Sequence, residues 1–461
     1  MLLKFVDRGE ELHTLDEKFH SPNAEFVIVY GRRRIGKTEL IKKFAHDKKH
    51  FYFLSRKEPL TLEVNRFRTK FSKKFNIYIE ETDDFEVLFR RIVEKIDISE
   101  KFVFLIDEFP YLIESYKPVV SVFQSVWDEV LKDKNVFLIL TGSSVSMMET
   151  EVLGYKSPLY GRRTGQLNIK EIPLSFLPKF LPGYDATDLI QSYGALGGIS
   201  FYLKEFDSKN GFFQNVENTF FNKHNILFQE AEILLKEELR EPNTYFNILK
   251  AMIDGATKLS EISTKSLVDI TNVNKYISVL QTLKLVRKIY PVMMPEKKRN
   301  FLYKVTDNYF RFWLSYVYPY KEEIEENPMG VTDFIKKQYQ EYMGSIFEDV
   351  VRQMLHVTDN CHFSTVGSWW YKENEIDIVA INERSKKILF GECKWQNKEM
   401  NKGVYEKLLE KKELVKWNND KWEENIALFS KSGFSHSLKK VAESENIMLY
   451  TLDDIKKILW G

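Results

Sequence analysis

One short stretch constrains the fold of this chain more than any other, the segment Gly31-Arg32-Arg33-Arg34-Ile35-Gly36-Lys37-Thr38. It fits G-x-x-x-x-G-K-[ST], the phosphate-binding loop of nucleoside triphosphatases. Gly31 and Gly36 allow the backbone to curve so that its N–H groups face the phosphates. We expect Lys37 to reach the β- and γ-phosphates and the hydroxyl of Thr38 to bind Mg²⁺. The segment therefore predicts that all eight residues form a site for ATP and Mg²⁺.

The residues on either side of this loop have the pattern that such a site needs. Residues 26–30 are all apolar, which is typical of a buried parallel strand. Residues 39–45 carry apolar side chains at helical spacing, and a helix that begins there points its positive end at the bound anion. An ordinary glycine turn is the alternative, but the order strand, loop, helix disfavours it.

Two acids follow the next apolar run and predict the other half of the site. Residues 102–106 are apolar, and Asp107 and Glu108 come directly after them. The carboxyl end of this strand is expected to emerge beside the phosphate loop. Asp107 would then hold Mg²⁺ through its water shell, and Glu108 would act as the general base for the attacking water. Acids also end strands by chance, so the prediction depends on the loop that precedes them.

Hydroxyl groups follow a further apolar run. Thr141, Ser143 and Ser144 come after residues 136–140, which predict a neighbouring strand. Hydroxyls at this position could sense the γ-phosphate or position water. Capping of a following helix by Ser143 or Ser144 is the alternative.

Two adjacent arginines, Arg162 and Arg163, lie in a polar segment between two glycines. One of them could reach a γ-phosphate as an arginine finger, either within the chain or from a neighbouring subunit of a homo-oligomer. A surface turn explains the pattern equally well. Residues 173–240 are mainly helical in pattern, so we expect an ATPase domain with a helical lid over residues 1–240.

The pattern changes over residues 241–325. Three helices and then a β-hairpin, the order of a winged helix, are predicted there by segments that begin near residues 245, 259, 273, 285 and 301. Residues 240–320 contain 13 Lys and Arg against 6 Asp and Glu, a local net charge of +7. This excess predicts contacts to duplex DNA from the third helix and the wing, made by Lys275, Lys297, Lys298 and Arg299. Use of the module only for interdomain packing is the alternative.

A second chemical constellation lies in residues 335–461, after a predicted linker over residues 320–329. Glu348 lies on a predicted helix, Asp377 on a strand, and Glu392 and Lys394 on one face of the next strand. Two carboxylates that meet at a sheet edge suit Mg²⁺, and a neighbouring ammonium suits metal-assisted phosphodiester hydrolysis. Asp377 and Glu392 are therefore candidate metal ligands, with Glu348 as a further contact. A charge-rich hairpin also produces this triplet by chance.

The composition of the chain limits the class of protein, its partners and its cellular compartment. The chain has 461 residues, 43% of them apolar and 29% charged, and its net charge of +1 argues neither for nor against nucleic acid. Cys361 and Cys393 are its two cysteines, which cannot form a disulfide framework, so a reducing cytoplasm fits. No apolar run approaches the roughly 18 residues that a membrane span needs, and the N-terminus lacks the apolar core of a signal peptide. We therefore expect a cytoplasmic protein without a membrane partner.

Taken together, the chain resembles the archaeal-type ATPase family. The segments that carry the resemblance are FVDRGEEL, GRRRIGKT, FLIDEFPYL, LILTGSS, SPLYGRRTG, YGALGGISFYL, NEIDIVA and FGECKW. Members pair an AAA+-like P-loop ATPase of the STAND kind with a winged helix and a C-terminal domain similar to PD-(D/E)XK nucleases. The resemblance thus implies an α/β multidomain chain with a parallel sheet, a winged helix and a restriction-endonuclease-like α/β/α domain.

The resemblance also implies roles that spacing alone does not. Arg8 and Glu11 would lie near the nucleotide base, and Arg162 or Arg163 would be the arginine sensor or finger. Asp377, Glu392 and Lys394 match the nuclease motif residue for residue, with Glu348 as its helical acid. Ile199-Ser200 follows Gly197-Gly198 where such proteins often carry a proline, and we expect this departure to touch no chemistry.

Two main functions follow from these patterns, and an enzyme that acts on some other phosphate ester is a third possibility. The first is an ATP-driven switch that licenses a C-terminal Mg²⁺-dependent DNA endonuclease. The second is an ATP-dependent regulator that binds DNA or protein and whose C-terminal domain does not cleave. The intact set of Asp377, Glu392 and Lys394 favours the first, because a pure binding module does not need all three.

Overall fold

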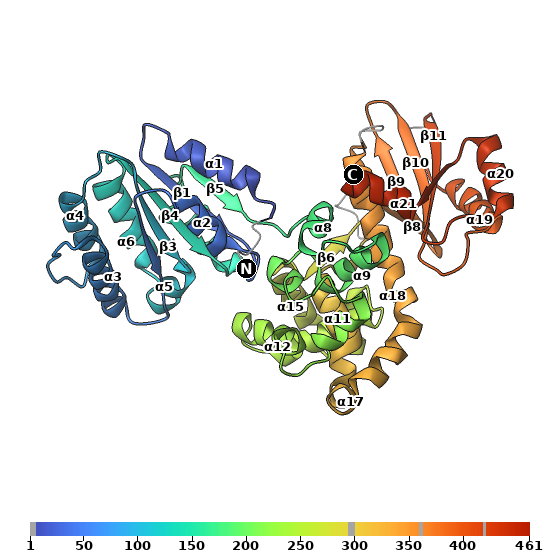
Figure 1. Cartoon of the computed structure of the whole chain (residues 1–461), viewed down its shortest axis with the longest axis horizontal. Helices are drawn as coiled ribbons and strands as arrows, with labels where there is room; N and C mark the ends of the chain where they lie inside the picture. The colour runs from blue at the N-terminus through green and yellow to red at the C-terminus, as the bar shows by residue number, and fades with distance from the viewer. Residues whose placement is uncertain (1–5, 294–299, 359–362, 418–420) are drawn as a thin grey trace. The chain divides into compact units, whose positions relative to one another are not determined.

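The computed structural model describes residues 6–293, 300–358, 363–417 and 421–461 (Figure 1). Lys297, Lys298 and Arg299, which were predicted to lie in a wing, and the cysteine Cys361 lie outside these ranges. The chain divides into two compact units. The first comprises Met1–Ile172 and Ile199–Phe201, and the second Pro173–Gly198 and Tyr202–Gly461.

The first unit is built on a five-stranded sheet with the strand order β2-β3-β4-β1-β5. Its strands are β1 (Glu25–Tyr30), β2 (His50–Leu54), β3 (Phe102–Asp107), β4 (Val136–Gly142) and β5 (Gly165–Asn168). All four strand pairings are parallel. Every residue of the three central strands is buried, because helices cover both faces. The predicted parallel sheet is therefore confirmed.

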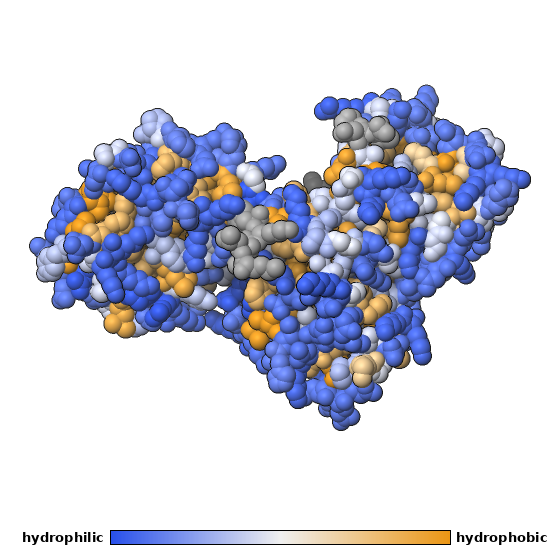
Figure 2. Space-filling model, viewed as in Figure 1, coloured by the Kyte–Doolittle hydropathy of each residue, from blue (hydrophilic) through white to orange (hydrophobic). Residues whose placement is uncertain are grey.

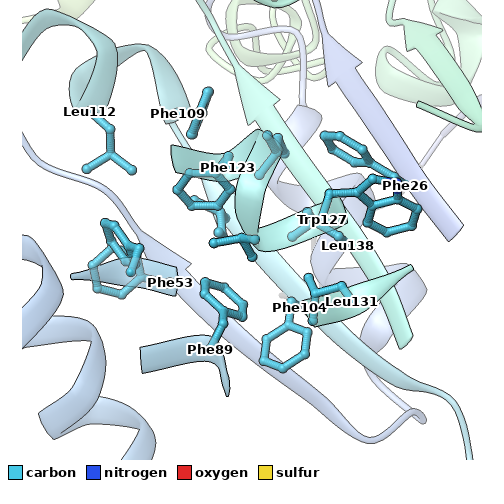
Figure 3. Close-up of a cluster of buried hydrophobic side chains, with 14 of the residues drawn as sticks. Phe26, Phe53, Phe89, Phe104, Phe109, Leu112, Phe123, Trp127, Leu131 and Leu138 are labelled. Atoms are coloured by element: carbon cyan, nitrogen blue, oxygen red, sulfur yellow. The ribbon is translucent and has the colours of Figure 1, made fainter. Parts of the chain in front are cut away.

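Alternate residues of the buried strands enter two separate cores. Val27 and Val29 pack with Leu40 and Phe44 on one face, which is covered by α1 (Gly9–Phe19) and α2 (Lys37–Ala45). Phe26 and its neighbours pack into a larger aromatic core on the other face (Figure 3). The helical segments that cover this second face are α3 (Leu60–Phe75), α4 (Phe85–Lys95), α5 (Phe109–Ser115), α6 (Val119–Ser125) and the π-helical η1 (Val126–Leu131).

The second unit begins with helices that we had assigned to the lid of the ATPase domain. They include α8 (Leu177–Phe180), α9 (Ala186–Leu196), α11 (Phe212–Asn218) and α12 (Ile226–Glu238). Tyr339 and Tyr342 donate hydrogen bonds to backbone carbonyls of α9, at 3.2 and 2.6 Å, and the indole of Trp313 donates to Phe228 O at 2.8 Å. These contacts with later helices explain why the compact division falls after Ile172 and not near residue 240.

Three helices and an antiparallel hairpin follow, in the order that the sequence predicts. They are α13 (Pro242–Ile253), α14 (Leu259–Ser266), α15 (Ile270–Thr282), β6 (Val286–Ile289) and β7 (Leu302–Val305). The segment after β6 contacts the C-terminal sheet, since Val292 N donates to Ser368 O at 2.9 Å. Val292 is buried and belongs to the core of that sheet.

The predicted linker over residues 320–329 is wrong. The segment contains the helix α17 (Lys321–Glu326) and the start of α18 (Pro328–Val357), a helix of 30 residues. Asn327 lies between them and caps α18 by accepting a hydrogen bond from Gly330 N at 3.1 Å. Ile324 of α17 is buried, so this Glu-rich segment has an apolar contact that its composition conceals.

The C-terminal part of the second unit is a mixed five-stranded sheet with the order β12-β11-β10-β9-β8. Its strands are β8 (Thr365–Tyr371), β9 (Asn374–Asn382), β10 (Lys387–Lys394), β11 (Glu423–Ser430) and β12 (Met448–Thr451). The pairings from β8 to β10 are antiparallel, and those from β10 to β12 are parallel. The helices packed with this sheet are α18, α19 (Lys402–Lys412), α20 (His436–Glu445) and α21 (Leu452–Trp460).

Hydrophilic residues dominate the visible surface, with apolar residues scattered among them (Figure 2). Among the described residues, no helix is both long enough and apolar enough to cross a membrane. The amphipathic helices bury their apolar sides in the cores of their own units, as is usual for helices of globular domains.

Candidate functional site

The phosphate loop connects β1 to α2, as the sequence predicts. Gly31 has φ +155° and Gly36 has φ +98°, backbone angles that side chains with a Cβ rarely adopt. A Cβ on Gly31 would also lie 2.5 Å from Ile169 O, which follows β5. Lys37 is buried, and its ammonium donates to Gly31 O and Arg32 O at 2.9 Å each. The loop therefore curls around its own lysine at the carboxyl end of β1.

Asp107 is the centre of a hydroxyl network at this end of the sheet. Its carboxylate is buried and accepts hydrogen bonds from Thr38 Oγ1 at 2.8 Å, from Tyr52 OH at 2.7 Å and from Thr141 Oγ1. The structure thus brings together the predicted residues Thr38, Asp107 and Thr141. Each comes from a different element, and adjacent parallel strands end at this edge of the sheet.

Tyr52 is a member of this network that the sequence analysis missed. It lies in β2, the neighbour of β3, and its phenol faces Asp107. Burial and the charge of Asp107 raise the pKa of Tyr52, so its hydroxyl stays protonated and donates. A tyrosine in a strand beside the acidic strand was the available signal, but strand order is needed to see it.

Glu108 lies one residue beyond the network and has an unusual backbone. Its φ of 55° is in the left-handed region, which costs a residue with a side chain on the order of 1 kcal/mol. Its carboxylate accepts hydrogen bonds from Ser143 N at 3.1 Å and Ser143 Oγ at 2.7 Å. Ser144 is the N-cap of α7 (Val145–Met147) without a side-chain cap bond. Ser144 therefore occupies the N-cap position of the capping alternative without a side-chain cap bond, whereas Ser143 holds the predicted general base.

The remaining residues of the loop have defined partners. Arg32 lies 3.6 Å from Glu171, Arg33 donates to Tyr111 OH at 3.4 Å, and the Arg34 guanidinium lies 4.3 Å from the ring centre of Phe201. Ile35 is buried in the core beneath α2.

The departure from the family pattern at Ile199-Ser200 lies beside this loop. Ser200 Oγ donates to Arg34 O at 3.4 Å, and a Cβ on Gly36 would lie 3.4 Å from the same hydroxyl. The segment thus contacts the phosphate loop directly, and our expectation that the departure touches no chemistry stays a prediction.

Arg8 also contacts the loop, although its role came only from resemblance. It is buried, donates to Lys170 O at 2.8 Å and Ile35 O at 3.4 Å, and pairs with Glu11 at 3.3 Å. The structure thus places Arg8 and Glu11 beside the phosphate loop, and their contact with a nucleotide base stays a prediction.

Arg162 and Arg163 do not join this network within the chain. They precede β5, whose first residue Gly165 pairs with Val27 near the start of β1, whereas the phosphate loop follows the end of β1. The backbone of the two arginines therefore lies near the amino ends of the strands, although the charge of Arg163 acts on Tyr30 at the carboxyl end of β1. Arg162 pairs with Asp128 at 2.8 Å. The role of either arginine as a finger, within the chain or from a neighbouring subunit, stays a prediction.

A second cluster of charges lies where the end of β10 pairs with the first half of the antiparallel strand β9. Gly391 pairs with Ile378, so Glu392 and Asp377 are the next residues of the two antiparallel strands. Lys394 Nζ lies 3.1 Å from Glu392 Oε2 and 3.4 Å from Asp377 Oδ2. The structure therefore brings together all three residues of the predicted motif.

Glu348 faces the same cluster from α18 but is held by an arginine. Arg352, one helical turn later, donates to Glu348 Oε2 at 2.8 Å, to Ser368 Oγ at 3.0 Å and to Asp377 O at 3.3 Å. Burial and the negative charge of Asp377 raise the pKa of Glu348 to about 7. Arg352 was not predicted, since its spacing from Glu348 is that of an ordinary surface ion pair.

Lys411 of α19 is the second cation that the sequence analysis missed. Its ammonium lies 2.7 Å from Glu392 Oε1, so each oxygen of Glu392 has its own lysine. Burial and the charge of Asp377 raise the pKa of Glu392, against the effect of these two lysines. Burial acts to lower the pKa of Lys394, but the carboxylates of Asp377 and Glu392 outweigh it and raise that pKa.

The chain matches two families of known proteins. Residues 5–206 match an ATPase domain found predominantly in Archaea, and residues 313–408 match archaeal and bacterial proteins of unknown function. The whole chain is similar to the uncharacterized protein MJECL04 of Methanocaldococcus jannaschii, at 34% identity over 98% of this chain and 99% of that protein. A stretch of 48 residues is 52% identical to the uncharacterized ATP-binding protein MJ0423 of the same organism, covering 10% of this chain and 81% of that protein.

Among solved structures, the Walker-type ATPase PABY2304 of Pyrococcus abyssi has a similar fold. The TM-score is 0.51 at 20% sequence identity, over 68% of this chain and 96% of that one. Fold and loop together define a P-loop ATPase. The chain belongs to the archaeal-type ATPase family, and its similarity to MJECL04 extends over nearly the full length of both chains.

Proposed function

We propose that this ATPase is a switch, AAA+- and STAND-like, that binds and hydrolyses ATP and controls a C-terminal Mg²⁺-dependent DNA endonuclease. The proposal of a C-terminal nuclease rests on the convergence of Asp377, Glu392 and Lys394 on neighbouring strands. Both carboxylates lie within 3.4 Å of the same ammonium group. The mixed sheet between helices is compatible with a PD-(D/E)XK, restriction-endonuclease-like fold.

The donor set of the C-terminal cluster suits a hard divalent cation. Among the described residues, no group of three or more His, Cys, Asp or Glu side chains could hold a metal ion. Asp377 and Glu392 nevertheless converge on one position, which the Lys394 ammonium occupies. Carboxylate oxygens are the ligands that Mg²⁺ prefers, and Mg²⁺ commonly uses one or two carboxylates with several waters. These two residues would therefore hold the ion.

In this proposal the protein groups divide the work. A bound Mg²⁺ supplies an activated water and stabilises charge on the phosphate. Asp377 and Glu392 would hold the ion, and Lys394 would then neutralise the phosphate oxygens. Glu348 is held close by Arg352 and adds an acceptor on the α18 side of the site.

In the proposed ATPase site, different residues would likewise bind the phosphates, hold the metal ion and activate the attacking water. Lys37 and the loop amides would hold the phosphates, while Thr38 and Asp107 would hold Mg²⁺. Glu108, oriented by Ser143, would accept the proton of the attacking water. Arg162 or Arg163 of a neighbouring copy would complete the site in a homo-oligomer.

DNA is the partner that the charge pattern favours. We propose that α13–α15 and the hairpin form a winged helix that binds duplex DNA, with exposed cations at Lys275, Arg287 and Lys288. The hydrogen bond from Val292 to Ser368 holds this hairpin beside β8 of the C-terminal sheet. Duplex bound there would lie near the proposed cleavage site.

Cleavage of plasmid and linear DNA with Mg²⁺ or Mn²⁺, with and without ATP, tests the proposal. We expect cutting that is lost in Asp377→Asn and altered in Lys37→Ala. Lys412→Met is the matched control, because this lysine of α19 pairs with Glu424, away from the cluster.

A second candidate function has one observation in its favour. The nearest charges to Glu348, Asp377 and Glu392 are cations that already pair with them, a state that a non-cleaving binding module could retain. DNA binding without cleavage under every condition, with ATP hydrolysis intact, would replace the nuclease by this ATP-dependent regulator.

A further inference from the structure

Lys411 has a position that the two-carboxylate motif does not explain. It lies in the last turn of α19 and reaches across to Glu392, whereas Lys394 comes from the same strand as that carboxylate. The side chain of Glu392 is only 4% exposed, while those of Lys411 and Lys394 are 25% and 34% exposed. The buried carboxylate is therefore paired with two lysines whose side chains are partly exposed.

Because the lysine side chains are more exposed than Glu392, the solvent-facing side of this site is cationic. The side chain of Asp377 is 17% exposed, between the values for Glu392 and the lysines. A divalent cation that bridges Asp377 and Glu392 would take the place of Lys394 between them. Positive charge would then exceed negative charge at the surface, and a phosphodiester is the group that such a surface attracts.

We propose that Lys411 is a second phosphate-contacting lysine of this site, released from Glu392 when a divalent cation binds. The inference rests on the proposed nuclease site and adds a substrate contact from α19. Lys411 then competes with the metal for Glu392 in the resting site and neutralises a DNA phosphate in the loaded one. Its loss should accordingly strengthen metal binding and weaken DNA binding, two opposite effects of one substitution.

Lys412 provides a matched control one residue away on the same helix. It pairs with Glu424 of β11, so Lys412→Met removes an equal charge from α19 without touching Glu392. Lys411→Arg retains the charge, and Asp377→Asn removes a carboxylate of the site itself. These three variants and the test variant Lys411→Met are all made in the full-length chain.

The first measurement is Mn²⁺ binding without nucleotide, followed through the electron paramagnetic resonance signal of free Mn²⁺. We expect Lys411→Met to tighten Mn²⁺ binding by about threefold or more, since a competing charge 2.7 Å from a ligand oxygen is removed. Asp377→Asn should abolish this site, and Lys412→Met should match the wild type.

The second measurement is binding of a duplex in Ca²⁺ as a function of salt. A lysine that contacts phosphate contributes about one unit to the slope of log affinity against log salt concentration. We expect Lys411→Met to lower the slope by about that amount and Lys411→Arg to retain it. A merely structural lysine would leave the slope unchanged.

The outcomes separate this inference from the proposed function. Lys411→Met with Mn²⁺ affinity and salt slope equal to those of Lys412→Met would overturn the role of Lys411, even if the wild type cuts DNA. Absence of cutting in the wild type, with both effects of Lys411→Met present, would refute the nuclease and leave the phosphate contact standing. Absence of any Asp377-dependent Mn²⁺ binding would overturn both.

Discussion

Glu348→Gln should change how the stability of the protein depends on pH. Burial and the charge of Asp377 raise the pKa of Glu348 to about 7, against an ordinary value of 4.5. Between these two values the folded state binds a proton that the unfolded state has lost. The contribution of Glu348 to the free energy of unfolding is therefore fully present below pH 4.5 and is lost as the pH rises through 7.

The size of this effect follows from the two pKa values. From pH 5 to pH 8 the ionisation of Glu348 should cost the wild type about 2.5 kcal/mol of unfolding free energy. Glutamine has no proton to lose, so Glu348→Gln should lack this loss. The substitution also removes one partner of Arg352, but Asp349 remains 2.5 Å from that guanidinium, and this constant term cancels in the comparison between pH values.

Urea unfolding followed by tryptophan fluorescence measures this difference. Six of the eight tryptophans lie after residue 360, so the signal reports mainly on the C-terminal sheet. Glu341→Gln is the matched control, because Glu341 lies exposed on the same helix. If Glu348→Gln and Glu341→Gln lost the same stability between pH 5 and pH 8, the assignment of a raised pKa to Glu348 would be refuted.

Three further changes test other parts of the structure. Gly31→Ala should abolish nucleotide binding and lower the free energy of unfolding by about 1 kcal/mol or more, because its Cβ would meet Ile169 O at a positive φ. Equilibrium binding of a fluorescent ATP analogue measures the first effect. Unchanged affinity would contradict the prediction. Ser143→Ala should lower kcat for ATP hydrolysis roughly tenfold with little change in KM. The substitution removes a hydrogen bond to the charged Glu108, and such a bond contributes about 1.5 kcal/mol. An unaltered kcat would show that Ser143 does not orient Glu108. Phe67→Ala should destabilise the first unit by about 3 to 5 kcal/mol, because Phe67 is fully buried among four phenylalanines; thermal unfolding with a loss below about 1 kcal/mol would contradict this packing.

The local sequence predicted those parts of the molecule that depend on neighbouring residues. The loop from Gly31 to Thr38 requires a strand before it and a helix after it, and both are present. The order of three helices and a hairpin was likewise visible, because helical and strand periodicities differ along the chain. Asp377, Glu392 and Lys394 meet as predicted, since alternate residues of a strand share a face.

Segments with long-range partners were predicted less well. The helices between residues 173 and 240 pack with α16 (Asn308–Phe312) and α18, distant in sequence, so they fall in the second compact unit. The ATPase domain over residues 1–240 stays a prediction. The Glu-rich segment before α18 is helical because Ile324 finds a buried contact. Composition describes what a segment can bury, but it does not say which partner will cover it.

By itself, the sequence of this protein determined that a phosphate loop, an acidic strand end and a carboxylate–lysine motif exist, because each is encoded by residues close together in the chain. Only the tertiary structure decided their additional partners: Tyr52 on Asp107, Ser143 on Glu108, and Arg352 and Lys411 on the C-terminal carboxylates. The physical reason is that a buried charge must be satisfied by whichever donor the fold brings within hydrogen-bond distance. Strand order and helix packing determine which donor this is, and the spacing of residues along the chain predicts neither of them.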